Sequence, residues 1–366
     1  MRKYLGILIV SAALLFIFYM PACAEEIRSE ITESDVPKEV LPYLPDGIFE
    51  TDIEHFRTAF SVSNVMKTVL SIIAYVFPQA AAAFSVLLGL TVISAVMAAL
   101  RESVASKNFG EFLNYVSAVC VCAAAFTFIK ELFAEFEIFI SRTTGFMAVV
   151  IPTMAALMLT GGEPSSSMVF GGVLSAVVTA LELICTSAVM PLLSALLCVY
   201  TVARISGYVD ISAFAKLLKN ITTYTLTGMI LIMTCVLTFQ SVIAKSADTA
   251  AVKGVKFVLG NAVPIVGGAL ADAVGTVASS LGMVKSATGI ASAVVLCVIC
   301  ASPVLKLLVW KLVFDAISAI ASAFSLNKEG EFFSNMGQIT AFLAAIMASI
   351  GVFFIIALTA ASLGGR

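Results

Sequence analysis

Five ionisable side chains lie inside segments that are otherwise apolar, and they are the residues best placed to do chemistry. They are Glu182, Asp272, Lys306, Lys311 and Asp315. Placing a charge at the centre of a bilayer costs at least about 2.5 kcal/mol, so such groups usually face a partner or a water path. Lys311 and Asp315 are four residues apart, on one helical face where they can pair. Two interpretations stay open: structural pairing or snorkelling of the charges, and the lining of a polar conduit or contact with another subunit.

The sequence offers no set of residues for covalent or metal-assisted catalysis. Its single histidine, His55, precedes the apolar part of the chain, which therefore lacks Ser–His or Cys–His nucleophile pairs, histidine metal ligands and a haem ligand. The cysteine pairs Cys120/Cys122 and Cys297/Cys300 lie deep in apolar sequence, where thiols usually act as small apolar side chains. We therefore expect a non-enzymatic protein with no catalytic residue, cofactor or metal site.

The composition excludes a water-soluble globular protein. Hydrophobic residues make up 60% of the chain, charged residues only 12%, and the mean hydropathy is +1.07, whereas soluble domains are about 45–50% apolar and about 25% charged. Repeated apolar runs have the length of membrane-spanning helices, about 20 residues. The sequence therefore predicts an all-α, polytopic transmembrane helix bundle in a lipid bilayer. Nucleic acid is not expected as a partner, because no basic patch with interleaved aromatic residues occurs.

The N-terminus has the parts of an export signal. Arg2 and Lys3 precede an apolar run at residues 4–20, and the small residues of Ala22-Cys23-Ala24 follow it. This order is typical of a cleavable signal peptide, which we expect at residues 1–24. An uncleaved anchor helix and a lipoprotein acylated at Cys23 stay open as alternatives.

An exported acidic segment is expected at residues 25–65. Between Glu25 and Arg57 there are three basic and ten acidic side chains, a local net charge of −7 (3 minus 10). Acidity suits a segment that crosses the membrane, because Lys and Arg resist translocation more strongly than Asp and Glu. Pro37, Pro42 and Pro45 predict a mixture of loop and short helix there.

Residues 66–366 are expected to form a multi-pass membrane domain of seven or eight membrane segments. Two amphipathic segments, 131–142 and 204–220, are expected outside the hydrocarbon, the second of them in the membrane interface. The apolar stretches from which these seven or eight segments are drawn are 63–76 (a half-length helix before Pro78), 79–100, 112–129, 145–160, 168–203, 221–243, 257–284, 287–309, 312–324 and 337–362. Basic residues flank the 221–243 stretch on both sides, so the positive-inside rule does not settle the orientation.

Prolines predict that some of these segments are broken or re-entrant. Pro152 and the Gly-Gly-Glu-Pro sequence at 161–164 favour a kinked span or a pair of half-helices. The 36 residues of 168–203 would be roughly 54 Å long as one straight helix, beyond a hydrocarbon core of about 30 Å. A break near Pro191 is therefore expected, and another at Pro303.

A stripe of small residues distinguishes the segment at 257–284. Glycine, alanine and serine recur every four positions there, which gives a smooth helix face that another backbone can approach closely. The alternative is a helix with too much glycine to be stable by itself. The candidate packing or conduit residues are Pro264, Gly267, Gly268, Ala271, Asp272 and Gly275.

An offset of 112 residues suggests an internal repeat of 145–243 in 257–355. It superposes Pro152 on Pro264 and Pro191 on Pro303, and transporter folds often have broken helices at matching positions of two halves. The few identities at this offset are also what such a biased composition gives by chance. Both interpretations stay open.

One stretch resembles a known family. Residues 261–274, Asn-Ala-Val-Pro-Ile-Val-Gly-Gly-Ala-Leu-Ala-Asp-Ala-Val, are similar to the central signature of the stage III sporulation protein AE family. The likeness extends over most of the chain, including the sequence Gly-Tyr-Val-Asp-Ile-Ser at 207–212 and the closing apolar span. Ala271 stands where a small hydroxyl residue is common in the family, which is a mild departure.

The resemblance implies a role in endospore formation. Members of the family are multi-pass proteins made in the mother cell and placed in the membrane that faces the engulfed forespore. A member would be a subunit of a secretion-like channel or feeding apparatus that sustains late forespore gene expression. Expected partners are the other membrane and ring subunits, including a secretion-type ATPase and a forespore-side protein. If the resemblance is set aside, a stand-alone secondary transporter or permease is the alternative.

Overall fold

The computed structural model describes residues 62–103, 107–205, 212–262 and 267–363, which form helices joined by short turns without a strand. Side chains are described for 70–100, 109–205, 213–238, 285 and 287–362. The helices are α3 (Val62–Ser103), α4 (Lys107–Thr160), α5 (Pro164–Ile184), the π-helical turn η4 (Cys185–Val189), α6 (Met190–Ile205), α7 (Ser212–Ala262), α8 (Gly267–Ala323) and α9 (Asn327–Leu363). The all-α prediction is confirmed. The signal peptide and nearly all of the acidic segment lie outside the described residues.

Six described helices are long and apolar enough to cross a membrane, when α5, η4 and α6 are counted as one rod. The prediction of seven or eight segments is not confirmed. It depended on interruptions at prolines, and α3, α4 and α8 instead run continuously through Pro78, Pro152 and Pro303. Each proline removes one hydrogen bond from a long helix, a cost that neighbouring helices and local adjustments can meet within a membrane bundle.

The predicted break near Pro191 is not found as an interruption: a π turn lies there, and the helical rod continues through it. In η4 the backbone N–H of Met190 donates to the carbonyl of Cys185, five residues earlier. Such a turn widens the helix locally, and it lies just before the proline that cannot donate. Over this turn the backbone hydrogen bonds span five residues in place of four, and the helical rod continues beyond it. The Gly-Gly-Glu-Pro sequence does end a helix, since α4 stops at Thr160, α5 starts at Pro164, and Gly162 has a φ of 84°.

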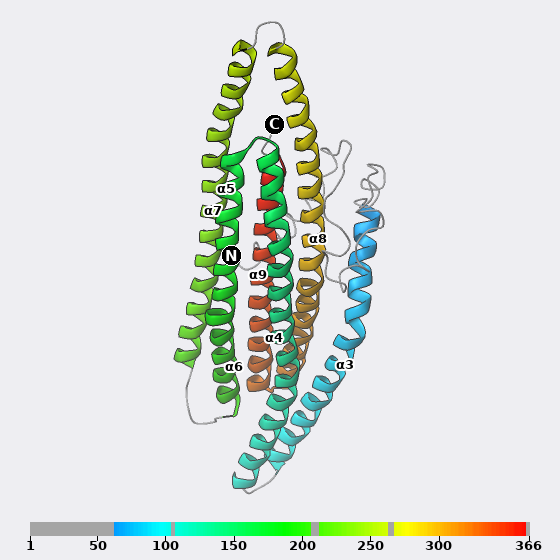
Figure 1. Ribbon diagram of the computed structural model, residues 1–366. Helices are drawn as coiled ribbons and strands as arrows, with labels where there is room; N and C mark the ends of the chain where they lie inside the picture. Colours follow the sequence, from blue (N-terminus) through cyan, green and yellow to red (C-terminus); the bar gives the residue numbers. More distant parts are fainter. Residues whose placement is uncertain (1–61, 104–106, 206–211, 263–266, 364–366) are drawn as a thin grey trace.

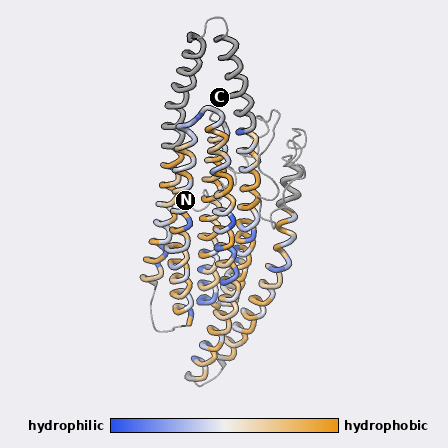
Figure 2. The backbone as a smooth tube through the Cα atoms, in the orientation of Figure 1, coloured by the Kyte–Doolittle hydropathy of each residue, from blue (hydrophilic) through white to orange (hydrophobic). Residues whose placement is uncertain are grey.

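The six long elements alternate in direction along one elongated bundle (Figure 1). α9 is the most deeply buried of the six, and its interface with α8 is the largest between any two described helices. α3 lies at one edge, against α4 and α8. Hydrophobic residues dominate the tube in Figure 2, and short hydrophilic stretches interrupt them, several in the centre of the view.

α8 and α9 form an antiparallel pair whose register can be read from close approaches. An added Cβ on Gly337 would lie 2.7 Å from Asp315 Oδ1, and one on Gly351 would lie 2.7 Å from Cys300 Sγ. Near the far end, a Cβ on Gly289 would lie 2.6 Å from the Cβ of Ser362. The two residue numbers of each contact add to 651 or 652, so the register holds over most of both helices.

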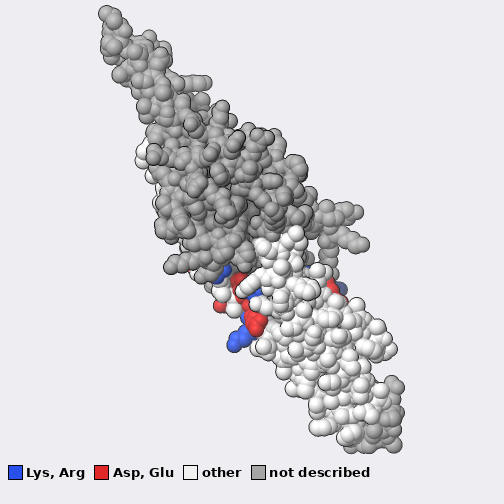
Figure 3. Space-filling view, turned by 90° about the vertical axis from the view of Figure 1, so that its right-hand side faces the viewer, with Lys and Arg blue, Asp and Glu red and all other residues white. Residues whose placement is uncertain are grey.

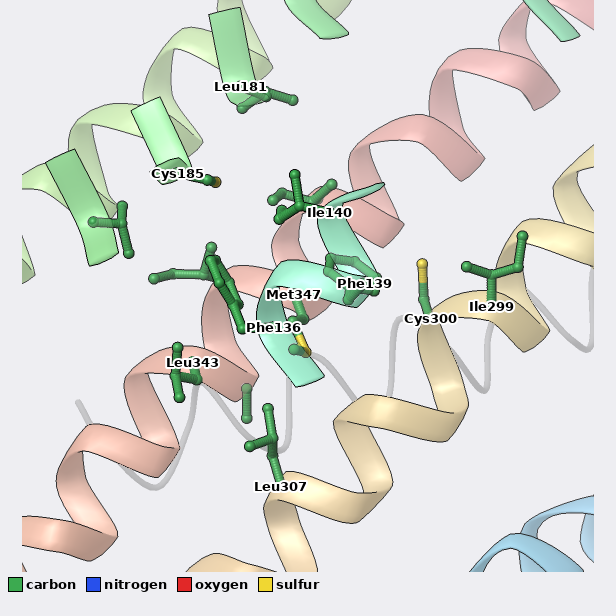
Figure 4. Close-up of a cluster of buried hydrophobic side chains, with 14 of the residues drawn as sticks. Phe136, Phe139, Ile140, Leu181, Cys185, Ile299, Cys300, Leu307, Leu343 and Met347 are labelled. Carbon is green, nitrogen blue, oxygen red and sulfur yellow. The ribbon is translucent and has the colours of Figure 1, made fainter. Parts of the chain in front are cut away.

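The centre of the bundle is filled by one apolar cluster that draws on almost every helix. Figure 4 shows Phe136, Phe139 and Ile140 of α4 among residues of α5, η4, α8 and α9. Phe136 and Phe139 are each 1% exposed. The prediction that residues 131–142 lie outside the membrane bundle as a separate element is therefore wrong. That segment is the middle of the 54-residue α4, and its buried phenylalanine side chains are part of the apolar cluster.

Candidate functional site

Four ion pairs join or brace the described helices. Arg204 of α6 pairs with Glu329 of α9, and Lys285 of α8 pairs with Glu163 of the α4–α5 turn. Lys306 of α8 pairs with Glu135 of α4, and Lys311 pairs with Asp315 within α8. Each pair that joins two helices brings together residues more than 100 positions apart in the sequence.

The Arg204–Glu329 pair lies where α6 ends and α9 begins. The side chains are 1% and 8% exposed, and Nη2 of Arg204 donates to Oε1 of Glu329. Nε and Nη1 of Arg204 have no hydrogen-bond partner among the described residues. Glu329 is thus the main described counter-charge of a buried guanidinium. The prediction that Arg204 begins a polar, interfacial helix is wrong, because Arg204 is in the last turn of α6 and is buried.

The Lys285–Glu163 pair lies at the opposite end of the bundle. Nζ of Lys285 donates to both carboxylate oxygens of Glu163 at 2.9 Å. The lysine side chain is 2% exposed, so its charged group is almost fully enclosed by the protein. The glycine turn before Glu163 therefore ends α4 and also places the carboxylate of Glu163 against α8.

The Lys306–Glu135 pair lies midway along the bundle. Nζ of Lys306 is 2.6 Å from Oε2 of Glu135, and both side chains are about one quarter exposed (26% and 21%). The α8–α9 register places Lys306 level with about residue 345, the midpoint of α9. α9 carries no ionisable side chain from 332 to 363. Glu135 and Lys306 therefore lie level with the middle of an uncharged part of α9.

The Lys311–Asp315 pair confirms the pairing predicted from the four-residue spacing. Asp315 also lies against α9, where Gly337 leaves room for its carboxylate. Beside this pair, Trp310 packs on Phe128 of α4 with ring centroids 5.3 Å apart. Its indole Nε1 has no hydrogen-bond partner among the described residues, so Trp310 is held by ring contacts with Phe128 and Phe314 and by the apolar cluster around it.

Small residues on α9 form the close-packed seam of the described bundle. Gly330, Gly337, Ala344 and Gly351 recur every seven residues, and an added Cβ at each of the three glycines would come within 2.7 Å of an atom of α8. Near the α8–α9 turn the hydroxyl of Ser318 donates to the carbonyl of Gly330 at 2.6 Å. A seven-residue repeat keeps one face of a helix against its neighbour.

The structure places the predicted site residues in three ways. Lys306, Lys311 and Asp315 are in ion pairs, whereas Glu182 is exposed on the outside of α5 and has no ion pair among the described residues. Pro264 lies outside the described residues. The remaining candidates are in the first turns of α8, but their side chains are not described: Gly267, Gly268, Ala271, Asp272 and Gly275. Their packing or conduit role stays a prediction, as does the internal repeat.

Five charged partners and the seam on α9 are not predicted by the sequence patterns. The five partners are Glu135, Glu163, Arg204, Lys285 and Glu329. The sequence pattern places the first and third in amphipathic segments and the second in a turn, and it singles out neither of the last two. A signal for the seam was available, because glycines at 330, 337 and 351 with Ala344 keep a strict seven-residue spacing. No comparable local signal pairs a lysine with a glutamate more than 100 residues away.

The described arrangement is suited to holding helices in register. Each of its three ion pairs between elements sets a cation against a carboxylate, and its interior is filled by apolar side chains. In the part of the chain with described side chains, no group of three His, Cys, Asp or Glu residues is placed to hold a metal ion. The seven described cysteines are free thiols.

Comparison with known proteins gives a consistent result. The family model described as stage III sporulation protein AE matches residues 47–364. Stage III sporulation protein AE of Bacillus subtilis (strain 168) is 24% identical over 222 residues, which is 60% of this chain and 55% of that protein. The matched part thus spans little more than half the length of that relative. No solved structure matched the chain.

Proposed function

Because this chain belongs to the stage III sporulation protein AE family, we propose that it is a non-enzymatic membrane subunit of a secretion-like channel or feeding apparatus linking mother cell and forespore. The role in sporulation and the multi-pass membrane character are supported by the family and by six apolar helices. The apparatus, its location in the mother-cell membrane around the forespore, and its partners are parts of the proposal.

The observation that carries the proposal is the extent of the family match. It covers every described helix, from α3 to α9, so the match extends over the whole described bundle and not one segment of it. The pairing of buried charges within that bundle supports a subunit built for rigidity. A rigid framework suits a component that holds other subunits around a conduit, including a secretion-type ATPase and a forespore-side partner.

The test is a deletion of the gene in its spore-forming host. We expect loss of heat-resistant spores and of late forespore transcription, with engulfment completed, and restoration of both by the wild-type gene supplied in trans. A fluorescent fusion should collect in the membrane around the forespore. Normal sporulation in the deletion strain would refute the proposal.

A charge-swap pair links this test to the structure. Arg204→Glu should fail to complement, because two carboxylates would then be buried together, and Arg204→Glu combined with Glu329→Arg should recover part of the function. The alternative of a stand-alone transporter predicts solute uptake by the purified protein in liposomes. We expect no uptake.

A further inference from the structure

Two carboxylates, Glu137 of α4 and Glu182 of α5, lie on the surface that these two neighbouring helices share. The helices meet at Gly171 of α5, where an added Cβ would lie 3.5 Å from the Cβ of Ala155 of α4. Glu137 precedes Ala155 by 18 residues (155 minus 137), which is five whole turns at about 3.6 residues per turn. Glu182 follows Gly171 by 11 residues (182 minus 171), which is about three turns. Both carboxylates therefore lie beside the α4–α5 contact, and both are exposed.

The two carboxylates also lie at a similar height along the bundle. The hydroxyl of Ser167 of α5 donates to the carbonyl of Ala155 of α4 at 2.6 Å, and α5 runs antiparallel to α4. Counting from this bond and from the contact above sets Glu182 level with residues 140–144 of α4. Glu137 is thus about 5–10 Å away along the helix axis, at about 1.5 Å per residue. Neither carboxylate has an ion pair among the described residues.

This height corresponds to the uncharged part of α9. A crossing of about 20 residues placed anywhere within the uncharged residues 332–363 includes residues 344–351. The Glu135–Lys306 pair is level with about residue 345, and α4 runs parallel to α9, so Glu137 is level with about residue 347. Glu137 therefore lies within the hydrocarbon wherever along this stretch α9 crosses it. Charges at such a depth face protein or water and not lipid.

Two serine hydroxyls on the same surface are also without a partner. Ser141 lies one turn beyond the α4 carboxylate and Ser175 two turns before the α5 carboxylate. Both are exposed, and neither Oγ has a hydrogen bond among the described residues. On α7, by contrast, the exposed hydroxyls of Thr223, Thr227 and Thr234 each donate to the carbonyl four residues earlier. Such internal bonding lowers the cost of a hydroxyl in lipid, so the hydroxyls of α7 suit lipid better than those of the α4–α5 surface.

The side of the bundle that carries α3 is of a different kind. Its exposed residues include Tyr75, Phe77, Ile93 and Val96, which suit contact with lipid. In Figure 3 the described surface of that side is uncharged over most of its area, and charged side chains gather near its upper boundary. Unbonded hydroxyls and unpaired carboxylates together therefore distinguish the α4–α5 surface from the lipid-facing side of α3.

From these observations we infer that the α4–α5 surface around Glu137 and Glu182 is in contact with water inside the membrane and is accessible to small hydrophilic solutes. Water is favoured over a protein partner because the surface carries both signs. Lys130, two turns before Glu137 on α4, is exposed and has no ion pair among the described residues, and the two lie about 10 Å apart along the axis. A partner would need an anion and cations at matching heights, whereas water solvates both signs and also bonds the serines. The inference requires only that the bundle is in a bilayer and is independent of the sporulation role.

Thiol accessibility of the full chain in membranes tests the inference. Ser141→Cys is made in a chain whose own cysteines are replaced by alanine, and its reaction with a charged, membrane-impermeant thiol reagent is timed with reagent on both sides of the membrane. The matched control is Thr234→Cys of α7, an exposed hydroxyl residue in a stretch, 220–244, without Lys, Arg, Asp or Glu. We expect severalfold faster reaction at 141 than at 234. Ala134→Cys, exposed on the same side of α4, is a second reporter in case the first variant folds poorly. Reaction at both reporters as slow as at the control would overturn the inference.

Reagents of opposite charge then test the carboxylates. Carboxylates concentrate cations in the water beside them, so a cationic reagent should be favoured over an anionic one of the same size at Ser141→Cys. Combining Glu137→Gln with Glu182→Gln should lower this rate ratio severalfold. Glu131→Gln is the matched control, because Glu131 is exposed on α4 but lies about 120° around the helix from Glu137, so the ratio should not change. A ratio that ignores the double variant, or that falls equally with Glu131→Gln, would overturn the assignment of these carboxylates to a water-facing surface.

Discussion

The Arg204–Glu329 pair gives the sharpest prediction about stability. Glu329→Gln keeps the size of the side chain but leaves the guanidinium of Arg204, whose side chain is 1% exposed, without its described counter-charge. Removing one member of a buried pair costs about 3–5 kcal/mol, which is about two to three and a half powers of ten in the unfolding equilibrium. Arg204→Leu should cost a similar amount. The measurement is the unfolding of the purified protein in mixed detergent micelles, followed by circular dichroism.

The double variant separates a lost interaction from a stranded charge. Arg204→Leu with Glu329→Leu removes both charges, so we expect a loss smaller than either single variant gives, because apolar replacement of a whole buried pair is often close to neutral. Glu331→Gln is the matched control, since Glu331 lies two residues away at the same end of α9 and is exposed. The reasoning fails if Glu329→Gln unfolds no more readily than the control, or if the losses of the two single variants simply add.

Three further variants probe other contacts. Gly351→Ala should destabilise the α8–α9 pair by about 1–3 kcal/mol through overpacking, because the added Cβ would lie 2.7 Å from a cysteine sulfur of α8. Gly172→Ala is the control, since nothing lies within 4 Å of its added Cβ. It should be neutral or stabilising in the same unfolding assay. Lys285→Glu should lower the unfolding midpoint and addition of Glu163→Lys should raise it again, whereas no recovery would mean that the pair is not the cause. Gly267→Leu should reduce co-purification with partner subunits, and unchanged co-purification would contradict the close-packing prediction.

The sequence was informative where local chemistry decides the structure. The apolar runs predict the helices, the Gly-Gly-Glu-Pro sequence predicts the end of α4, and four-residue spacing predicts the Lys311–Asp315 pair. In each case the relevant atoms lie within one or two helical turns, so no knowledge of the tertiary fold is needed.

The middle of α4 shows why the rest could not be predicted. Residues 131–142 alternate charged and aromatic side chains, a pattern that an interfacial helix and a buried helix with charged partners share. The choice depends on Lys306, 171 residues from Glu135, and on the apolar cluster around Phe136. A local pattern carries neither piece of information. The prolines wrongly predicted breaks for a similar reason. A single lost hydrogen bond destabilises only slightly a helix of more than 40 residues that packs against its neighbours.

The number of crossings has a consequence that a topology experiment can check. With six crossings, the start of α3 and the end of α9 lie on the same side of the membrane, as they lie at the same end of the bundle in Figure 1. If residues 1–24 direct export, that side is extracytoplasmic. An alkaline phosphatase fused after Leu363 should then be active, and a fusion in the 206–211 connection should be inactive. An odd number of crossings predicts the opposite C-terminal result, so an inactive C-terminal fusion with an active one after residue 163 would contradict the six-helix arrangement.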